Sequence, residues 1–284
     1  MFREMNIGTA KPSDEQLRQV RHHFINNLSL NDYYSAAQYE SEVLDLISHY
    51  GKDHKVMMMV GGSMMYIDAV CKGIDDIPTI DEDTRLAMKE KLHNEGLERM
   101  CEELRLLDPE YYSIVDHKNT QRVVHALEIC YMTGKTYTSF RRNTNKTRPF
   151  TVIKVGLRRQ RENLFSRINK RVDQMILDGL LKETEQLINS QSSISNSQSS
   201  IPNSPLSLST QSLPNSLNTV GYKEMINVLK GEWSLDFAVE RMKKNTRVYA
   251  KKQMTWFQKD QDIHWFDIDD TPIDTLITGI ESLF

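Results

Sequence analysis

Two arginines spaced one helical turn apart offer the clearest chemistry in this 284-residue sequence. Arg167 and Arg171 lie in a segment with a helical apolar pattern, so both side chains fall on one face of the predicted helix. Guanidinium groups are fixed positive charges with several N–H donors, and they suit phosphate and diphosphate groups. The spacing therefore predicts an anion-binding face. The alternative is an exposed basic face in which the arginines pair with Glu162 or Asp173.

A serine hydroxyl is the next candidate. Ser63 follows Gly61 and Gly62, which end an apolar run at residues 55–60. The run predicts a buried strand, the glycines a tight turn, and the residues after Ser63 a helix. A hydroxyl in a loop at the carboxyl end of a strand can contact a bound ligand. The alternative is that Ser63 is the N-cap of the following helix, and the two roles are compatible.

A third group lies on a predicted helix over residues 120–133, which Gly134 closes. Gln121, Arg122 and His125 share one turn of it. They form either a polar binding face or a solvated helix surface. Arg85 stands near the start of another predicted helix and by itself reads as a surface residue.

Basic residues beside aromatic ones suit RNA, because cations hold phosphates while rings stack on bases. Near the carboxyl end, the candidates of this kind are Tyr222 and Lys223, which follow a glycine turn at Gly221, and Lys251 and Lys252. The neighbouring Trp256 is placed at helical spacing and reads as a core residue or as a stacking surface.

The elements that must position these residues predict an α/β protein. Two core segments, residues 1–75 and 145–284, flank a helical insertion at 76–144 that has no strand pattern. In the insertion, a helical stretch over 81–108 is broken near Gly96. The carboxyl-terminal part is predicted to contain a strand at 151–157, an amphipathic helix at 161–189, a long helix at 234–259 and an edge strand at 264–266.

One segment of the core has a different composition. Residues 186–222 contain no Asp, Glu, Lys or Arg, and Ser and Asn dominate. Such a composition cannot offset the entropy of ordering the chain, so residues 190–217 are predicted to be a disordered, dispensable insertion.

Composition limits the class of protein. With 39% hydrophobic and 26% charged residues, the chain can form a globular core. It has no apolar run of membrane-spanning length and no signal-peptide pattern. Its three scattered cysteines read as reduced thiols in a cytoplasmic protein. The net charge is −3, yet residues 141–171 hold eleven Lys/Arg and one acid, and residues 241–252 hold six and none. Local clusters rather than net charge decide phosphate binding.

Five blocks together resemble the tRNA dimethylallyltransferase (tRNA isopentenyltransferase) family. They are residues 5–12 (Met-Asn-Ile-Gly-Thr-Ala-Lys-Pro), 60–66 (Val-Gly-Gly-Ser-Met-Met-Tyr), 119–128 (Asn-Thr-Gln-Arg-Val-Val-His-Ala-Leu-Glu), 167–172 (Arg-Ile-Asn-Lys-Arg-Val), and 220–224 (Val-Gly-Tyr-Lys-Glu) with 246–256 (Thr-Arg-Val-Tyr-Ala-Lys-Lys-Gln-Met-Thr-Trp). Each block alone is moderately specific, but their order across nearly the whole chain is strong evidence.

The resemblance implies a P-loop-kinase-like, nucleotide-binding parallel sheet whose helical insertion grips the tRNA anticodon arm. It implies transfer of a dimethylallyl group from dimethylallyl diphosphate to the N6 amine of the adenosine 3′ to the anticodon, with Mg²⁺, by a cytoplasmic monomer. Arg171, with Arg167, would contact the diphosphate, and Ser63, where the family usually has Thr, the target nucleotide. The other implied tRNA contacts are Arg85, Gln121, Arg122, His125, Gly221, Tyr222, Lys223, Lys251 and Lys252. The family usually has Arg where this chain has His125.

Two family motifs are not found in this sequence. They are the phosphate loop Gly-x-x-x-x-Gly-Lys-[Ser/Thr] and the Asp-Ser-Arg-Gln block, which carries the expected general base. The chain is expected to begin inside a family motif, without the usual Mg²⁺ ligand, and to transfer dimethylallyl groups at least ~10⁴-fold more slowly than a complete enzyme. Two alternatives stay open: an adenylate isopentenyltransferase acting on free nucleotides, and a non-catalytic tRNA-binding remnant.

Overall fold

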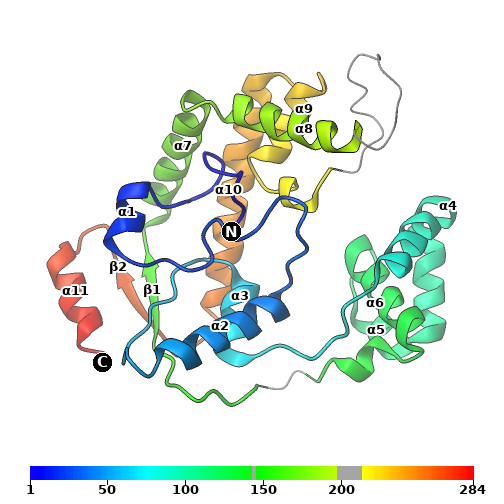
Figure 1. Ribbon diagram of the computed structural model, residues 1–284, viewed down its shortest axis with the longest axis horizontal. Coiled ribbons are helices and arrows are strands. Elements are labelled where there is room, and N and C mark those ends of the chain that lie inside the picture. Colours follow the sequence, from blue (N-terminus) through cyan, green and yellow to red (C-terminus); the bar gives the residue numbers. More distant parts are fainter. Residues whose placement is uncertain (143–144, 197–212) are drawn as a thin grey trace. The chain divides into compact units, whose positions relative to one another are not determined.

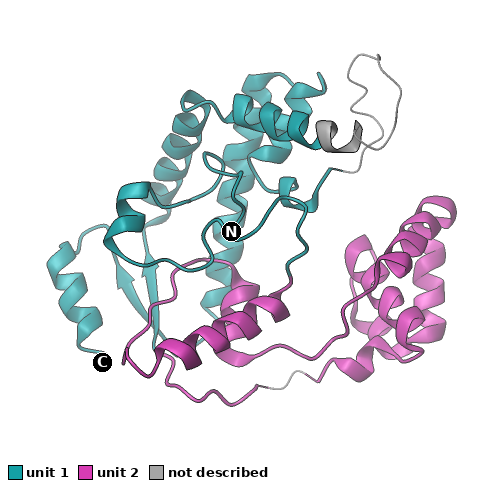
Figure 2. Ribbon diagram, in the orientation of Figure 1, with its two compact units in different colours: residues 1–34, 153–284 teal, residues 35–152 magenta. Residues whose placement is uncertain are grey.

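The computed structural model describes residues 1–142, 145–196 and 213–284. The chain divides into two compact units (Figure 2): unit 1 contains residues 1–34 and 153–284, and unit 2 contains residues 35–152. The predicted insertion at 76–144 lies inside unit 2, and its boundaries stay a prediction. None of the helices in the described ranges has an apolar stretch long enough to cross a bilayer.

Unit 1 contains a two-stranded parallel sheet together with several helices. Strand β1 (Lys154–Arg158) pairs with β2 (Ile263–Asp267), so that Lys154 lies opposite Ile263. Both strands were predicted, although β1 begins three residues later than expected. The helices are α1 (Asp14–Gln19), α7 (Arg161–Leu177), α8 (Leu180–Asn196), α9 (Tyr222–Leu229), α10 (Leu235–Phe257) and α11 (Ile273–Glu281), with a short 3₁₀ helix η2 (Asn215–Leu217).

The core of unit 1 forms where α7, α8, α9 and α10 pack together (Figure 1). Its fully buried side chains include Leu180, Leu217, Tyr222 and Met225. The aromatic ring of Tyr222 is the largest of them and is 0% exposed. This core fixes the positions of α7 and α10, the two helices that carry the basic clusters of unit 1.

The predicted single helix over residues 161–189 is wrong, because the chain turns between α7 and α8. Gly179 has φ +96°, a conformation that glycine adopts without a side-chain clash, and it interrupts the helical hydrogen bonding. The apolar stripe predicted on α7 is present, since Val172 and Met175 are buried. The break allows α8 to fold back onto α9 rather than to continue away from the core.

The serine-rich segment is only partly tested. Residues 190–196 belong to α8, and Leu217 is 1% exposed in the core, so the predicted disordered boundaries of 190–217 are wrong at both ends. Ser216 Oγ also donates a hydrogen bond of 3.0 Å to the Leu30 carbonyl. Residues 197–212 lie outside the described part of the chain.

Unit 2 consists of two helix groups. Helix α2 (Ala36–Tyr50) packs on α3 (Met64–Lys72), and α4 (Glu82–Leu107) packs on α5 (Pro109–Ile114) and α6 (Thr120–Thr133). We call α4, α5, α6 and the following 3₁₀ helix η1 (Tyr137–Phe140) the insertion helices. The described residues of 76–144 contain no strand, as predicted. Gly96 breaks α4 with φ +79°, and Gly134 ends α6 in the left-handed conformation, also as predicted.

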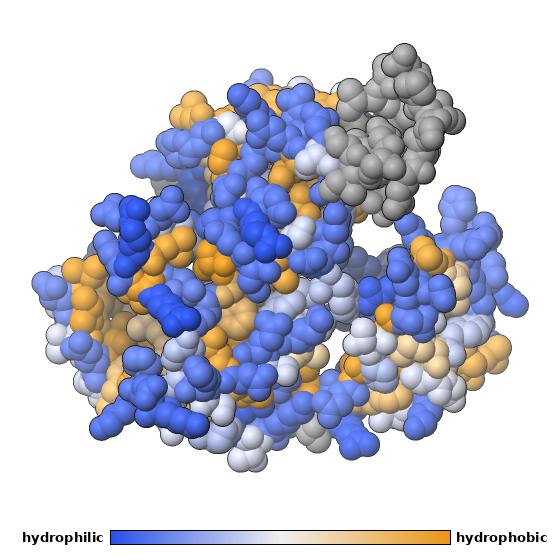
Figure 3. Space-filling model, in the orientation of Figure 1, coloured by the Kyte–Doolittle hydropathy of each residue, from blue (hydrophilic) through white to orange (hydrophobic). Residues whose placement is uncertain are grey.

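The strand predicted at residues 55–60 is absent. These residues have no regular structure and are exposed, with Met58 81% and Val60 85% exposed. Apolar side chains at the molecular surface are orange in Figure 3. A strand is stable only when its backbone groups pair with a neighbour, and within the described ranges no strand pairs with residues 55–60. An apolar pattern alone therefore did not produce the strand.

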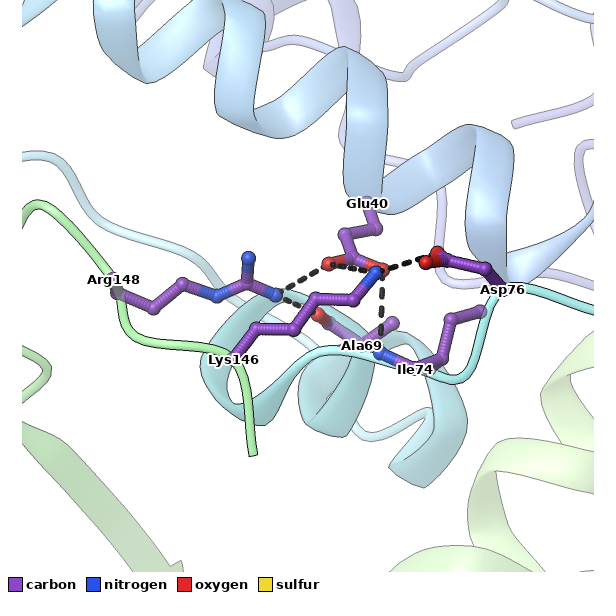
Figure 4. A network of polar contacts seen from close by, with 6 residues as sticks. All are labelled: Glu40, Ala69, Ile74, Asp76, Lys146 and Arg148. Atoms are coloured by element: carbon purple, nitrogen blue, oxygen red, sulfur yellow. Dashed lines mark hydrogen bonds and ion pairs between the residues drawn. The ribbon is translucent and has the colours of Figure 1, made fainter. Parts of the chain in front are cut away.

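A buried ion pair connects the segments on either side of the insertion helices (Figure 4). Arg148 Nη2 donates hydrogen bonds of 2.6 Å to Glu40 Oε1 on α2 and to the Ala69 carbonyl on α3. The side chains of Arg148 and Glu40 are each 7% exposed. Lys146 Nζ lies 3.7 Å from the same carboxylate and 2.9 Å from Asp76 Oδ1. The Glu40 carboxylate thus binds both the segment that follows α3 and the segment that follows the insertion helices.

Candidate functional site

The two arginines of α7 are exposed and unpaired within the described ranges. Arg167 and Arg171 make no hydrogen bond or ion pair with any described residue. Asp173, one of the partners that the sequence offered, instead accepts an ion pair of 2.8 Å from Lys243 on α10. The opposite face of α7 is buried through Val172 and Met175. The packing of α7 therefore turns both guanidinium groups to solvent, where an external anion can bind.

A third arginine, which sequence reasoning missed, links α10 to the same helix. Arg247 Nη1 donates a hydrogen bond of 2.6 Å to Asn169 Oδ1, and its guanidinium carbon lies 5.9 Å from the ring centroid of Phe165. Arg161 lies 5.2 Å over the same ring. The sequence signals for Arg247 were its places in the basic cluster at residues 241–252 and in the family block at residues 246–256.

The carboxyl-terminal turns of α10 carry the remaining basic candidates of unit 1. Lys251 and Lys252 are exposed. Trp256 is 46% exposed, so the interpretation that it is a core residue is not supported. The lysines and the indole therefore meet the first requirement for an RNA contact, which is access from solvent.

Two of the three predicted contacts at the start of α9 are not accessible. Gly221 is buried and Tyr222 is fully buried, so the structure does not support direct tRNA contacts by either residue. The Tyr222 hydroxyl donates a hydrogen bond of 2.6 Å to Glu183 Oε1. Burial raises the pKa of Tyr222, and the Glu183 carboxylate raises it further. Lys223 is exposed and remains a candidate.

Glu183 is a positioning residue that no local pattern revealed. Its carboxylate accepts hydrogen bonds from three consecutive backbone N–H groups, at 3.3 Å from Asn6, 3.0 Å from Ile7 and 3.4 Å from Gly8. The Gly8 N–H also donates to the Tyr222 hydroxyl at 3.2 Å. A side chain at Gly8 would collide with the Tyr222 ring, so this close approach requires glycine. The loop that carries residues 5–12 is thus fixed to α8 and α9.

In unit 2, the Ser63 hydroxyl is available. Ser63 is at the N-cap position of α3, as one interpretation of the sequence predicted, but its side chain makes no capping hydrogen bond. The residue is exposed, and its hydroxyl makes no hydrogen bond with a described residue. The hydroxyl is therefore not occupied by the helix and can hydrogen-bond to a ligand.

The polar face predicted on α6 is present. Gln121 and Arg122 are exposed. His125 is partly buried, with Nδ1 3.5 Å from Glu128 Oε2. Arg85 is partly buried on α4, the helix that packs against α6. The candidates from the insertion helices thus come from two adjacent helices of one packed group.

Comparison with known proteins identifies the family. Residues 1–260 match the IPP transferase family. The tRNA dimethylallyltransferase 1 of Phocaeicola vulgatus is 55% identical over 269 residues, which are 95% of this chain and 83% of the relative. The protein of the same name from Bacteroides thetaiotaomicron is 53% identical over 266 residues, 94% of this chain and 80% of the relative. This chain belongs to the tRNA dimethylallyltransferase family.

The family has solved structures with the same fold. The crystal structure of the full-length tRNA isopentenylpyrophosphate transferase of Bacillus halodurans matches with a TM-score of 0.64 at 30% identity, covering 99% of this chain and 83% of the other. The predictions of an α/β fold and of a prenyltransferase that acts on tRNA are confirmed.

The family resemblance implied Mg²⁺ as a cofactor. This cation prefers oxygen ligands in near-octahedral geometry. Within the described ranges, no three His, Cys, Asp or Glu side chains gather in a way that could hold a metal ion. Mg²⁺ is commonly held by one or two carboxylates together with substrate phosphates, so a diphosphate substrate would supply part of its ligands. No catalytic step below uses the metal.

Proposed function

We propose that this chain transfers a dimethylallyl group from dimethylallyl diphosphate to the N6 amine of the adenosine 3′ to the tRNA anticodon. The observation that carries the proposal is the pair of exposed, unpaired arginines on α7, inside one of the blocks that define the family resemblance. The relatives' names support dimethylallyl transfer, and the basic clusters support an RNA substrate.

In the proposed reaction, the N6 lone pair forms a bond to C1 of the dimethylallyl group while the C1–O bond breaks. The diphosphate departs with the electron pair of that bond, and N6 loses one proton. Arg171 and Arg167 stabilise the negative charge that develops on the departing diphosphate, because preorganised cations act most strongly where charge appears. No described residue is assigned as the base that takes the proton.

The adenine must leave its stack to react, as in other enzymes that modify a base. We propose that Ser63 hydrogen-bonds to this nucleotide and that Gln121, Arg122 and His125 contact the neighbouring anticodon arm. Arg85, Lys223, Lys251 and Lys252 would add phosphate contacts. We further propose that the protein is cytoplasmic, because its three free cysteines suit a reducing compartment, and that it acts as a monomer.

A single-turnover assay tests the proposal. The chain, in excess over substrate, would be given Mg²⁺, dimethylallyl diphosphate and either unmodified tRNA or AMP, and products would be identified by mass spectrometry. We expect a slow reaction that modifies the adenosine 3′ to the anticodon and leaves AMP unchanged. Prenylated AMP without prenylated tRNA would instead indicate an adenylate isopentenyltransferase. Tight tRNA binding without product would indicate a binding protein.

A further inference from the structure

An aromatic cluster lies on the insertion helices beside the proposed tRNA contacts. It consists of Tyr111 on α5, His125 on α6 and Tyr137 on η1. The Tyr137 ring is 4.7 Å from the Tyr111 ring and 5.5 Å from the His125 ring, with edge-to-face geometry in both pairs. The guanidinium carbon of Arg141 lies over the cluster, 5.1 Å from the Tyr111 centroid and 5.9 Å from the Tyr137 centroid.

A buried carboxylate holds this cluster rigidly. Asp108, which is 1% exposed, accepts hydrogen bonds of 3.0 Å from the Tyr111 N–H and 2.7 Å from the Thr138 N–H. It also accepts one of 2.8 Å from the Thr138 hydroxyl. The start of α5 and the 3₁₀ helix that carries Tyr137 are thereby fixed to one side chain. A site built on these residues is preorganised, so little conformational entropy is lost when a ligand binds.

The polar groups at the edge of the cluster are not satisfied by the described residues. The Tyr137 hydroxyl makes no hydrogen bond there, and it is not among the buried polar atoms that lack a partner. Arg141 and Arg122 form no ion pair with a described carboxylate. Burial raises the pKa of Tyr137, and the nearby Tyr111 and Asp75 raise it further. The positive charges of Arg141 and Arg122 lower it. The Arg141 guanidinium and the Tyr137 hydroxyl thus belong to one cluster, and neither has a polar partner among the described residues.

We propose that Arg141 and the Tyr137 hydroxyl, together with Arg122, bind one phosphate group of the tRNA backbone. This inference rests on the proposed function and assigns RNA contacts to Arg141 and Tyr137. A phosphate suits the site because the Arg141 guanidinium and the Tyr137 O–H belong to one cluster, while Arg122 precedes His125 by three residues on the same face of α6. Stacking of a base is less suited, because the rings of Tyr137 and Tyr111 already pack against each other and under Arg141.

Matched charge variants test the proposal. Arg141→Gln and Arg142→Gln each remove one positive charge at neighbouring positions, but Arg142 lies outside the cluster. Binding of the full chain to an anticodon stem-loop would be measured over a range of salt concentrations. We expect Arg141→Gln to weaken binding by about tenfold, because a charge-assisted hydrogen bond is lost. The slope of the logarithm of the binding constant against the logarithm of the salt concentration (the salt slope) should fall by about one. Arg142→Gln should change the binding constant and the salt slope by less than Arg141→Gln does.

A second pair of variants separates the hydroxyl from the ring. Tyr137→Phe keeps the edge-to-face contacts and should weaken RNA binding several-fold with an unchanged salt slope, since no charge is lost. Tyr112→Phe is the control, because Tyr112 stacks on His117 outside the cluster. Circular dichroism would verify that each variant folds.

The outcomes distinguish this inference from the proposed function. Wild-type protein that fails to prefer the anticodon stem-loop over an unrelated hairpin overturns both. Wild-type protein that shows this preference, with Arg141→Gln and Arg142→Gln indistinguishable, overturns only the phosphate site.

Discussion

Two arginine sites, one in each unit, show opposite uses of the same side chain. In unit 2, Arg148 is buried and hydrogen-bonded to the Glu40 carboxylate and to a backbone carbonyl. In unit 1, Arg167 and Arg171 are exposed and have no carboxylate partner among the described residues. A guanidinium needs a partner for its charge wherever water is excluded. The presence or absence of a carboxylate thus separates an arginine that maintains the fold from one that is free to bind a ligand.

Breaking the buried pair should have the largest effect. Glu40→Gln keeps the side-chain shape but leaves Arg148 buried without a counter-charge, and should lower the free energy of unfolding by about 3–5 kcal/mol. Urea denaturation measures this quantity. Asp76→Asn is the control, because that carboxylate is 92% exposed and its ion pair with Lys146 should contribute less than about 1 kcal/mol. Replacing both Glu40 and Arg148 by apolar residues should recover much of the loss. Equal losses of stability in Glu40→Gln and Asp76→Asn would contradict the view that burial makes the Glu40–Arg148 pair important.

Removing an unpaired arginine should affect binding and leave stability unchanged. Arg171→Ala should weaken the binding of dimethylallyl diphosphate by about 10–100-fold, as expected for lost charge-assisted hydrogen bonds. Its free energy of unfolding should change by no more than about 0.5 kcal/mol. Lys170→Ala removes the same charge from the adjacent position, which points about 100° away around the helix. Calorimetric titration that finds the same weakening in both variants would argue for general attraction rather than a defined site.

Removing the Tyr222 hydroxyl, which hydrogen-bonds to Glu183 and Gly8 in unit 1, should have an intermediate effect on stability. Tyr222→Phe removes a donor to Glu183 and an acceptor of the Gly8 N–H, and should lower the free energy of unfolding by about 1–2 kcal/mol. Hydrogen exchange of the amides of residues 6–8 should become faster. Tyr249→Phe, at a position that is 43% exposed, should change stability by less than about 0.5 kcal/mol. Unchanged exchange at residues 6–8 would show that Glu183 alone holds the loop.

The smallest effect is expected from the serine-rich segment. Replacing residues 197–212 by a short Gly/Ser linker keeps α8 and the buried Leu217 in place. Loop-closure entropy changes slowly with length, so the free energy of unfolding should change by no more than about 1 kcal/mol. A loss of several kcal/mol in thermal or urea denaturation would show that this segment contributes to the folded state.

The sequence by itself determined the features that depend on local interactions. The break at Gly96 and the end of α6 at Gly134 follow from the backbone freedom of glycine, and the start of α10 follows from the Ser234 cap. The family and its activity also followed from the order of short motifs. Helix ends and motifs are encoded within a few residues, so a single sequence is enough to find them.

Only the tertiary structure decided which side chains are buried and which have partners. The apolar run at residues 55–60 lacks a neighbouring strand, and Tyr222 fills the core instead of meeting RNA. Asp173 pairs with Lys243, which leaves Arg171 available. The partners of Glu183 are as many as 177 residues away along the chain. These outcomes depend on contacts between distant segments, and such contacts exist only once the helices have packed.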